Sequence, residues 1–170
     1  ITIDGEEIVV PKAVPATDSQ GNIIIIDGSG RTIPRRTTIY DAALLLARKK
    51  NPSNPRAALN IPTVCHAEHL PPVGVCRVCS VEVAKLQPDR KDPSQKREVA
   101  SDKLVPACVH PVEPGMIIHT YRSPNQAAAK RVGQQVKVLL ELLAGDHLPG
   151  EGKSESELGT LVADLQPDLG

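Results

Sequence analysis

Aromatic residues are almost absent from this sequence of 170 residues, which has no Phe, no Trp and only two Tyr, Tyr40 and Tyr121. Proteins that bind single-stranded nucleic acids stack the bases on aromatic side chains, so this class of function is disfavoured. Hydrophobic residues still make up 40% of the chain, and a chain of this length buries roughly two-thirds of its surface on folding. The core must therefore be built from Ile, Leu, Val and Ala.

The sequence also lacks an excess of charge of either sign. Lys and Arg number 20, as do Asp and Glu, whereas proteins that bind nucleic acids need a basic surplus. The longest apolar runs, Ala42–Ala47 and Ile23–Ile26, are far shorter than the roughly 20 residues that span a bilayer. No charged segment followed by an apolar one opens the chain, so no secretory signal is predicted. We expect a cytoplasmic protein, a location that includes a complex docked on the inner face of a membrane.

The N-terminal segment is rich in turn signals. Ile1–Ile3 and Glu6–Val10, joined by Asp4 and Gly5, predict a β-hairpin. Residues 11–22 are polar and predict a loop, and the β-branched run Ile23–Ile26 predicts a buried strand.

Two helices are predicted from capping signals and apolar periodicity. Thr38 and a carboxylate three residues later form a capping box, and the helix that follows should end near Lys49. Ser123 is the expected cap of a second helix, with an apolar stripe over residues 128–143 and an end at Gly145.

The rest of the chain gives weaker signals. Met116–Thr120 predicts a returning strand, whereas the mixed-charge stretch Lys85–Lys103 predicts a surface loop. The C-terminal tail predicts at most a short helix around Glu155–Leu165.

Four cysteines carry most of the functional information, at the spacing Cys65-x10-Cys76-x2-Cys79-x28-Cys108. They are compatible with two disulfides, a four-thiolate zinc site or an iron–sulfur cluster. Disulfides are disfavoured because nothing marks the chain as secreted. Structural zinc usually uses two close pairs of cysteines, and here there is one. Three grouped cysteines with a remote fourth are typical of a plant-type [2Fe–2S] centre, although the first gap is ten residues rather than four.

The loop between the first two cysteines contains Pro71, Pro72 and Gly74. These residues favour a fixed, bent backbone that can approach a ligand closely. Backbone N–H groups aimed at the sulfurs would raise the reduction potential of a cluster.

The segments around the cysteines resemble one known family. They read Ile61–Cys65 (IPTVC), Pro72–Val83 (PVGVCRVCSVEV), Leu104–Cys108 (LVPAC) and Gly115–Thr120 (GMIIHT). This pattern resembles the N-terminal [2Fe–2S] domain of the large iron–sulfur subunit of bacterial NADH:quinone oxidoreductase (respiratory complex I). Similar domains occur in diaphorase subunits of NAD-linked hydrogenases, in iron-only hydrogenases and in NAD-dependent formate dehydrogenases.

The resemblance implies an α+β fold. Residues 1–120 would form a β-grasp ferredoxin-like domain, and residues 121–170 a long helix followed by an irregular tail. It implies one [2Fe–2S] cluster per chain, with Cys65, Cys76, Cys79 and Cys108 as ligands. It also implies a one-electron carrier subunit, not catalytic alone, that exchanges electrons with an NADH-oxidising flavoprotein or another iron–sulfur subunit.

The sequence departs from the family pattern in two respects. Family members commonly follow the long helix with a His and three Cys that bind a [4Fe–4S] cluster, whereas here His147 stands alone and no cysteine follows it. A [4Fe–4S] cluster is therefore not expected, and His147 is expected in a solvated loop. Residues 11–31, 51–59 and 85–103 look like insertions, either docking surfaces or plain loops.

The remaining candidate residues have ordinary interpretations beside the functional ones. His66 and His69 follow Cys65 closely but are not needed as ligands, and Arg77 either tunes the potential of the cluster or faces solvent. His110 and His119 are expected to have no special role. Two other functions stay open: the N-terminal part of a hydrogenase or formate dehydrogenase chain, and a zinc-bound structural or assembly module.

Overall fold

The computed structural model describes residues 1–16, 22–25, 30–67, 72–90, 92–147 and 156–169. The strands are β1 (Thr2–Ile3), β2 (Glu6–Glu7), β3 (Ala13–Pro15), β4 (Pro34–Arg36), β5 (Ser80–Pro88), β6 (Lys96–Ala100), β7 (Val105–Pro106) and β8 (Met116–His119). The helices are α1 (Ile39–Lys50), a short 3-10 helix (Pro55–Ala58), α2 (Gln126–His147) and α3 (Glu157–Leu169).

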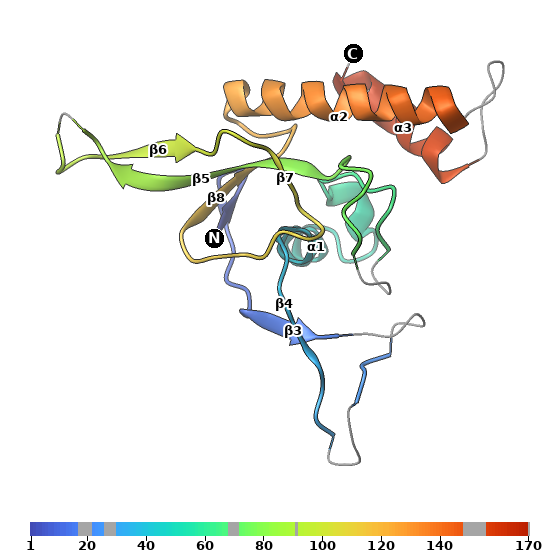
Figure 1. Cartoon of the computed structure of the whole chain (residues 1–170), viewed down its shortest axis with the longest axis horizontal. Helices are drawn as coiled ribbons and strands as arrows, with labels where there is room; N and C mark the ends of the chain where they lie inside the picture. Colours follow the sequence, from blue (N-terminus) through green and yellow to red (C-terminus); the bar gives the residue numbers. More distant parts are fainter. Residues whose placement is uncertain (17–21, 26–29, 68–71, 91, 148–155, 170) are drawn as a thin grey trace.

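The main sheet has six strands. Five follow the order β2-β1-β8-β5-β6, and β7 pairs with β5. β1 runs parallel to β8, and the other neighbours are antiparallel. Helix α1 lies on one face of this sheet, and α2 and α3 lie on the other (Figure 1). The architecture is α+β with a long helix after the last strand, as expected for a ferredoxin-like domain.

Strand β5 presents different chemistry on its two faces. Val81 and Val83 pack into the hydrophobic core with α1. Ser80 and Glu82, which alternate with them, point to α2 and are 2% and 5% exposed. Alternation along a strand places these two pairs on opposite faces, so the sheet is apolar towards α1 and partly polar towards α2.

The predicted start of α1 is confirmed. The Thr38 hydroxyl accepts a hydrogen bond from the backbone N–H of Asp41, and the Asp41 carboxylate accepts one from the backbone N–H of Thr38. This reciprocal pair satisfies two donors that a helix end otherwise leaves open. Arg35 donates two further hydrogen bonds to Asp41, at 2.6 and 2.8 Å.

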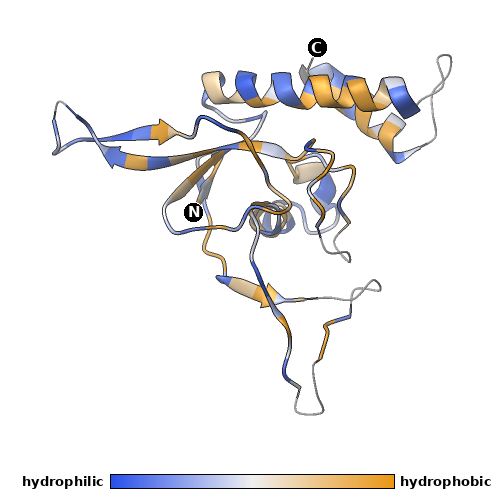
Figure 2. Ribbon diagram, viewed as in Figure 1, coloured by the Kyte–Doolittle hydropathy of each residue, from blue (hydrophilic) through white to orange (hydrophobic). Residues whose placement is uncertain are grey.

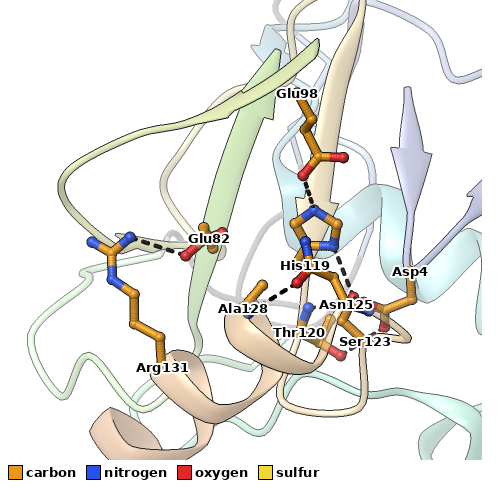
Figure 3. Close-up of polar contacts among 9 residues, drawn as sticks. All are labelled: Asp4, Glu82, Glu98, His119, Thr120, Ser123, Asn125, Ala128 and Arg131. Atoms are coloured by element: carbon orange, nitrogen blue, oxygen red, sulfur yellow. Dashed lines mark hydrogen bonds and ion pairs between the residues drawn. The ribbon is translucent and has the colours of Figure 1, made fainter. Parts of the chain in front are cut away.

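The boundaries of α2 differ from those predicted. Asn125 caps the helix, because its side chain accepts from the Ala128 N–H at 3.3 Å. The Ser123 hydroxyl lies instead 2.8 Å from Nδ1 of His119 (Figure 3). The helix continues through Gly145 to His147, because Gly145 does not adopt the positive φ of a helix terminator.

The prediction of a plain loop at residues 11–22 is wrong in part. Strand β3 pairs with β4 in a second, two-stranded sheet, which projects from the main body (Figure 1). The predicted burial of Ile23–Ile26 is also wrong for its described residues, since Ile23 and Ile25 are 52% and 59% exposed. Ile25 bridges Thr32 within this projecting arm, so β-branched residues mark an extended backbone here but not a core.

The loop predicted at Lys85–Lys103 is also wrong. The second half of β5 and all of β6 form an antiparallel hairpin, with Ala84 opposite Ala100 and Pro88 opposite Lys96. The hairpin extends beyond the body of the domain, and its outer half is hydrophilic (Figure 2). Its polar composition suits a hairpin that is exposed on both faces. Such a hairpin lacks the alternation of apolar and polar residues that predicts a strand from sequence.

The C-terminal tail contains the helix expected around Glu155–Leu165, and α3 extends it to Leu169. Leu165 is 6% exposed and packs with Val136 and Leu140 of α2. Within the part of the chain that the structure describes, no helix combines the length and hydropathy needed to cross a membrane.

Candidate metal centre

The four cysteines lie in two connecting segments: Cys65, Cys76 and Cys79 between the 3-10 helix and β5, and Cys108 between β7 and β8. Cys79 immediately precedes β5, and Cys108 follows β7 after one residue. Because β5 and β7 pair, with Ser80 opposite Pro106, these two cysteines are brought together. Their sulfurs lie 3.4 Å apart, and both residues are 1% exposed.

The loop that carries Cys108 is also fixed by α1. The backbone N–H of Tyr40 donates to the carbonyl of Ala107 at 3.0 Å, and that of Ile39 donates to the carbonyl of His110 at 2.9 Å. These are first-turn N–H groups that no residue within the helix can satisfy. The start of α1, set by its capping box, therefore positions one side of the site.

Cys65 and Cys76 form a second pair, and both are half-buried. The backbone N–H of Cys76 donates to the Cys65 sulfur at 3.5 Å. The backbone of Val75 also lowers the pKa of Cys65, and the backbones of Val64 and Val78 act in the same direction on the pKa of Cys76. An amide N–H group is thus directed at a cysteine sulfur, as expected from the bent loop between the two cysteines.

Gly74 is required by the shape of that loop. Its φ is +67°, and an added Cβ would lie 3.1 Å from Cγ1 of Val109. Both the left-handed backbone and the close approach favour glycine at this position. Of the two prolines predicted to shape the loop, Pro71 lies outside the described residues.

Each pair contains one cysteine that favours the thiolate. The hydrogen bond with Cys108, aided by the N–H groups of Cys108 and Ala107, lowers the pKa of Cys79 to about 6. The same bond raises the pKa of Cys108, with burial adding to the effect. Burial alone would raise the pKa of Cys65, but the N–H groups of Cys76 and Val75 outweigh it and lower that pKa. Burial raises the pKa of Cys76.

The arrangement of the sulfurs can be compared with the two metal centres considered. A tetrahedral zinc site needs four ligands around one ion. Among the described residues, no group of three or more His, Cys, Asp or Glu is placed to hold a single ion. Two pairs of thiols, one of them with an amide donor, instead fit a binuclear cluster, in which each pair would hold one iron.

The other candidate residues lie outside this arrangement. His66 makes an edge contact with the Tyr40 ring, at 4.8 Å between centroids, and Arg77 is exposed. His69 is outside the described residues, and His147 is exposed at the end of α2 rather than in a loop. His110 is half-buried and contributes its carbonyl to the start of α1.

A polar network behind the site was not predicted. His119 is 5% exposed, and its ring nitrogens lie 2.8 Å from the Ser123 hydroxyl and 2.6 Å from the Glu98 carboxylate. Next to it, Glu82 pairs with Arg131 of α2 at 2.9 Å (Figure 3). The alternation of Ser80 and Glu82 with valines is the sequence signal that indicates a polar second face.

A groove of about 840 Å³ lies beside Cys65. One wall is formed by Tyr40, Tyr121 and the segment from Ile61 to Ala67, and the other by α3. Cys65 thus lines an open recess of the molecular surface.

Comparison with known proteins bears directly on this geometry. Residues 23–123, more than half of the chain, match the model of a family described as 2Fe-2S iron-sulfur cluster binding domain. The chain is 29% identical over 124 residues to the alpha subunit of the NADPH-Fe(3+) oxidoreductase of Geobacter sulfurreducens, covering 73% of this chain and 11% of that protein. It is 32% identical over 109 residues to a subunit of the NADH-quinone oxidoreductase of Rickettsia typhi, covering 64% of this chain and 12% of that protein.

The chain therefore spans only about a tenth of the length of these curated relatives. Both comparisons agree with the resemblance drawn from the cysteine segments, and the family match supports a [2Fe–2S] cofactor. This chain belongs to the family of 2Fe–2S iron–sulfur cluster binding domains.

Proposed function

We propose that this chain is a one-electron carrier in an NAD(P)H-linked oxidoreductase complex, with Cys65, Cys76, Cys79 and Cys108 as the ligands of its cluster. The observation that carries the proposal is the two-by-two arrangement of the sulfurs. The Cys79–Cys108 pair is buried and the Cys65–Cys76 pair is half-buried. A [2Fe–2S] cluster supplies the chemistry by accepting and releasing one electron at a time.

The residues of the chain have distinct tasks in this function. The four thiolates hold the irons, so the protons of Cys76 and Cys108, whose pKa values are raised, must leave when the metal binds. The N–H group of Cys76 donates to the Cys65 sulfur, and such a donor favours the reduced, more negative state of a cluster. The β5–β7 ladder and the start of α1 exclude water from the Cys79–Cys108 side.

The partner is proposed from the relatives. The names of these relatives describe oxidoreductases of NADPH or NADH. A flavoprotein that oxidises NAD(P)H, or a neighbouring iron–sulfur subunit, would supply the electron, and the complex would lie in the cytoplasm or at the inner face of a membrane. We also propose residues 1–120 as the ferredoxin-like unit and residues 121–170 as its helical extension.

Spectroscopy with metal analysis tests this proposal. The anaerobically purified chain should contain two irons and no zinc, and dithionite should produce an S = ½ EPR signal. Single Cys→Ser variants at the four positions should lose or shift the visible bands. His66→Ala should keep them, because His66 contacts Tyr40 and is not needed as a ligand. A colourless protein with one zinc would contradict the carrier and support the zinc-bound module.

A further inference from the structure

Four exposed valines surround the half-buried pair of cysteines. They are Val64, Val73, Val75 and Val109, at 39%, 61%, 73% and 39% exposure, and we name them the valine rim. Soluble domains seldom gather exposed large aliphatic side chains around a functional group unless another surface covers them.

Contacts between the loops show that the rim is one surface. Val64 precedes Cys65, Val75 precedes Cys76, and the N–H of Cys76 donates to the Cys65 sulfur at 3.5 Å, so these two valines flank the same pair. Gly74 stands between Val73 and Val75 in the sequence. A Cβ added at Gly74 would lie 3.1 Å from Cγ1 of Val109, so the Val109 side chain packs over Gly74.

The rim is nearly free of charge. In the segments 61–67, 72–81 and 104–112, Arg77 is the sole Lys, Arg, Asp or Glu in the sequence. The β5–β6 hairpin differs sharply, since half of residues 85–100 are charged. An uncharged face gains free energy by meeting another uncharged, apolar face, and gains little from long-range electrostatic steering.

The position of the rim decides what kind of partner it fits. Cys79 and Cys108 are buried beneath β7 and the start of α1, whereas Cys65 and Cys76 reach the surface inside the rim. Electron transfer between protein-bound centres weakens steeply with distance. A redox partner must therefore approach on this side rather than from the sheet or from the charged hairpin.

We infer that the valine rim is the electron-transfer docking surface, and that its occupant is an uncharged, apolar face of a protein partner with a redox centre close behind it. This inference rests on the proposed function and adds the location and chemistry of the contact. Val64 also lines the groove beside Cys65, so the rim and the groove adjoin each other.

The first test uses the chain with its cluster and a small anionic oxidant. The dithionite-reduced cluster gives one electron to ferricyanide, which becomes ferrocyanide, and stopped-flow absorbance follows the rate. Val75→Lys places a positive charge at the rim and should raise this rate at least about threefold at low ionic strength. Val9→Lys is the matched control, because Val9 is 90% exposed and lies outside the cysteine loops. Equal rates in the two variants would overturn the inference.

The second test uses the native complex, isolated through a tag on the full-length gene product. Val73→Lys and Val75→Lys should slow NAD(P)H-driven reduction of the cluster at least about tenfold, because a lysine charge would be buried against an apolar face. Val9→Lys should stay within about twofold of the wild type. Unchanged reduction in the rim variants would overturn the inference.

Two further outcomes separate this inference from the proposed function. A preparation without the cluster EPR signal contradicts the proposed function, whereas intact signals with unaffected rates contradict the docking surface alone. Sedimentation of the isolated chain supplies the other distinction. If the wild type forms dimers that Val75→Lys abolishes, while NAD(P)H-driven reduction is unaffected, the rim is a contact between copies and the inference is overturned.

Discussion

Arg131 of α2 and Glu82 of β5 form an ion pair at 2.9 Å in which the Glu82 side chain is 7% exposed and the Arg131 side chain 39%. Four residues along α2, Gln135 donates to the Ser80 hydroxyl at 2.8 Å. One helical turn advances about 5.4 Å and two strand residues about 6.6 Å, so the spacings of the two elements nearly match. These contacts fix the register of α2 on the polar face of the sheet.

Replacing Arg131 should therefore destabilise the domain. Arg131 also donates to the carbonyls of Ser101 and Asp102. Its loss removes these hydrogen bonds and leaves the buried Glu82 carboxylate without its ion-pair partner. We expect Arg131→Ala to reduce the free energy of unfolding by about 1–3 kcal/mol in urea titrations followed by circular dichroism. Arg97→Ala is the control, because Arg97 lies 3.8 Å from Asp89 and its side chain is 54% exposed, and it should cost less than about 0.5 kcal/mol. Equal losses of unfolding free energy in the two variants would show that the Arg131–Glu82 pair stabilises the domain no more than the Arg97–Asp89 pair does.

A second prediction concerns the shape of the cysteine loop. Gly74→Ala imposes a side chain on a left-handed backbone and pushes a Cβ against Val109, so we expect weaker retention of the cluster and a loss of about 1–3 kcal/mol. Gly115→Ala is the matched control for backbone strain, since the φ of Gly115 is +75° and no atom lies within 4 Å of a Cβ added there. Iron content and visible absorbance after gel filtration measure the difference.

The double variant Gly74→Ala with Val109→Ala separates contact from backbone strain. Removing the valine methyls should restore part of the iron content lost in Gly74→Ala. If Gly115→Ala loses as much stability, and the double variant recovers nothing, backbone strain alone accounts for the effect.

A third prediction is a pH dependence at the start of α1. Burial alone would raise the pKa of Asp41, but the hydrogen bonds from Arg35 and Thr38 outweigh it and lower that pKa. A carboxyl whose pKa falls on folding stabilises the folded state above its unfolded pKa of about 3.9, and this contribution is lost as the pH drops through the folded value. Asp41→Asn should thus cost about 1–2 kcal/mol at pH 7 and progressively less below about pH 5.

Unfolding of the wild type and of Asp41→Asn, compared at each pH, measures this difference directly. A gap between the two proteins that stays constant from pH 7 down to pH 3 would show that the Asp41 charge contributes nothing.

A fourth prediction concerns the C-terminal helix. Leu165 packs in the same hydrophobic cluster as Val78, against which Cys76 lies. Leu165→Asp should detach α3 and open the Cys76 side to solvent, so the cluster bands should bleach faster in air-saturated buffer, about threefold or more. Leu142→Asp is the matched control, since Leu142 is 62% exposed on α2. Equal bleaching rates would show that α3 does not protect this side.

Several features were predicted from the sequence because they depend on interactions between residues that are close in the chain. The capping box of Thr38 and Asp41 and the apolar stripe of α2 depend on residues a few positions apart, so their signals are contained in the sequence. The segments around the cysteines resemble one family, and that resemblance implies the cofactor, because these segments are short stretches of sequence that can be compared directly.

Only the tertiary structure decided which distant segments meet. The pairing of β5 with β7 brings Cys79 to Cys108, and the hairpin of β5 with β6 forms from a stretch whose composition predicts a loop. Ser123 carries a capping signature, yet its hydroxyl is engaged by His119, and Asn125 caps the helix instead. Ile23 and Ile25 have the side chains of a core strand but extend into an arm outside the core. In each case the free energy of a long-range contact outweighs a local preference, and no local pattern contains that contact.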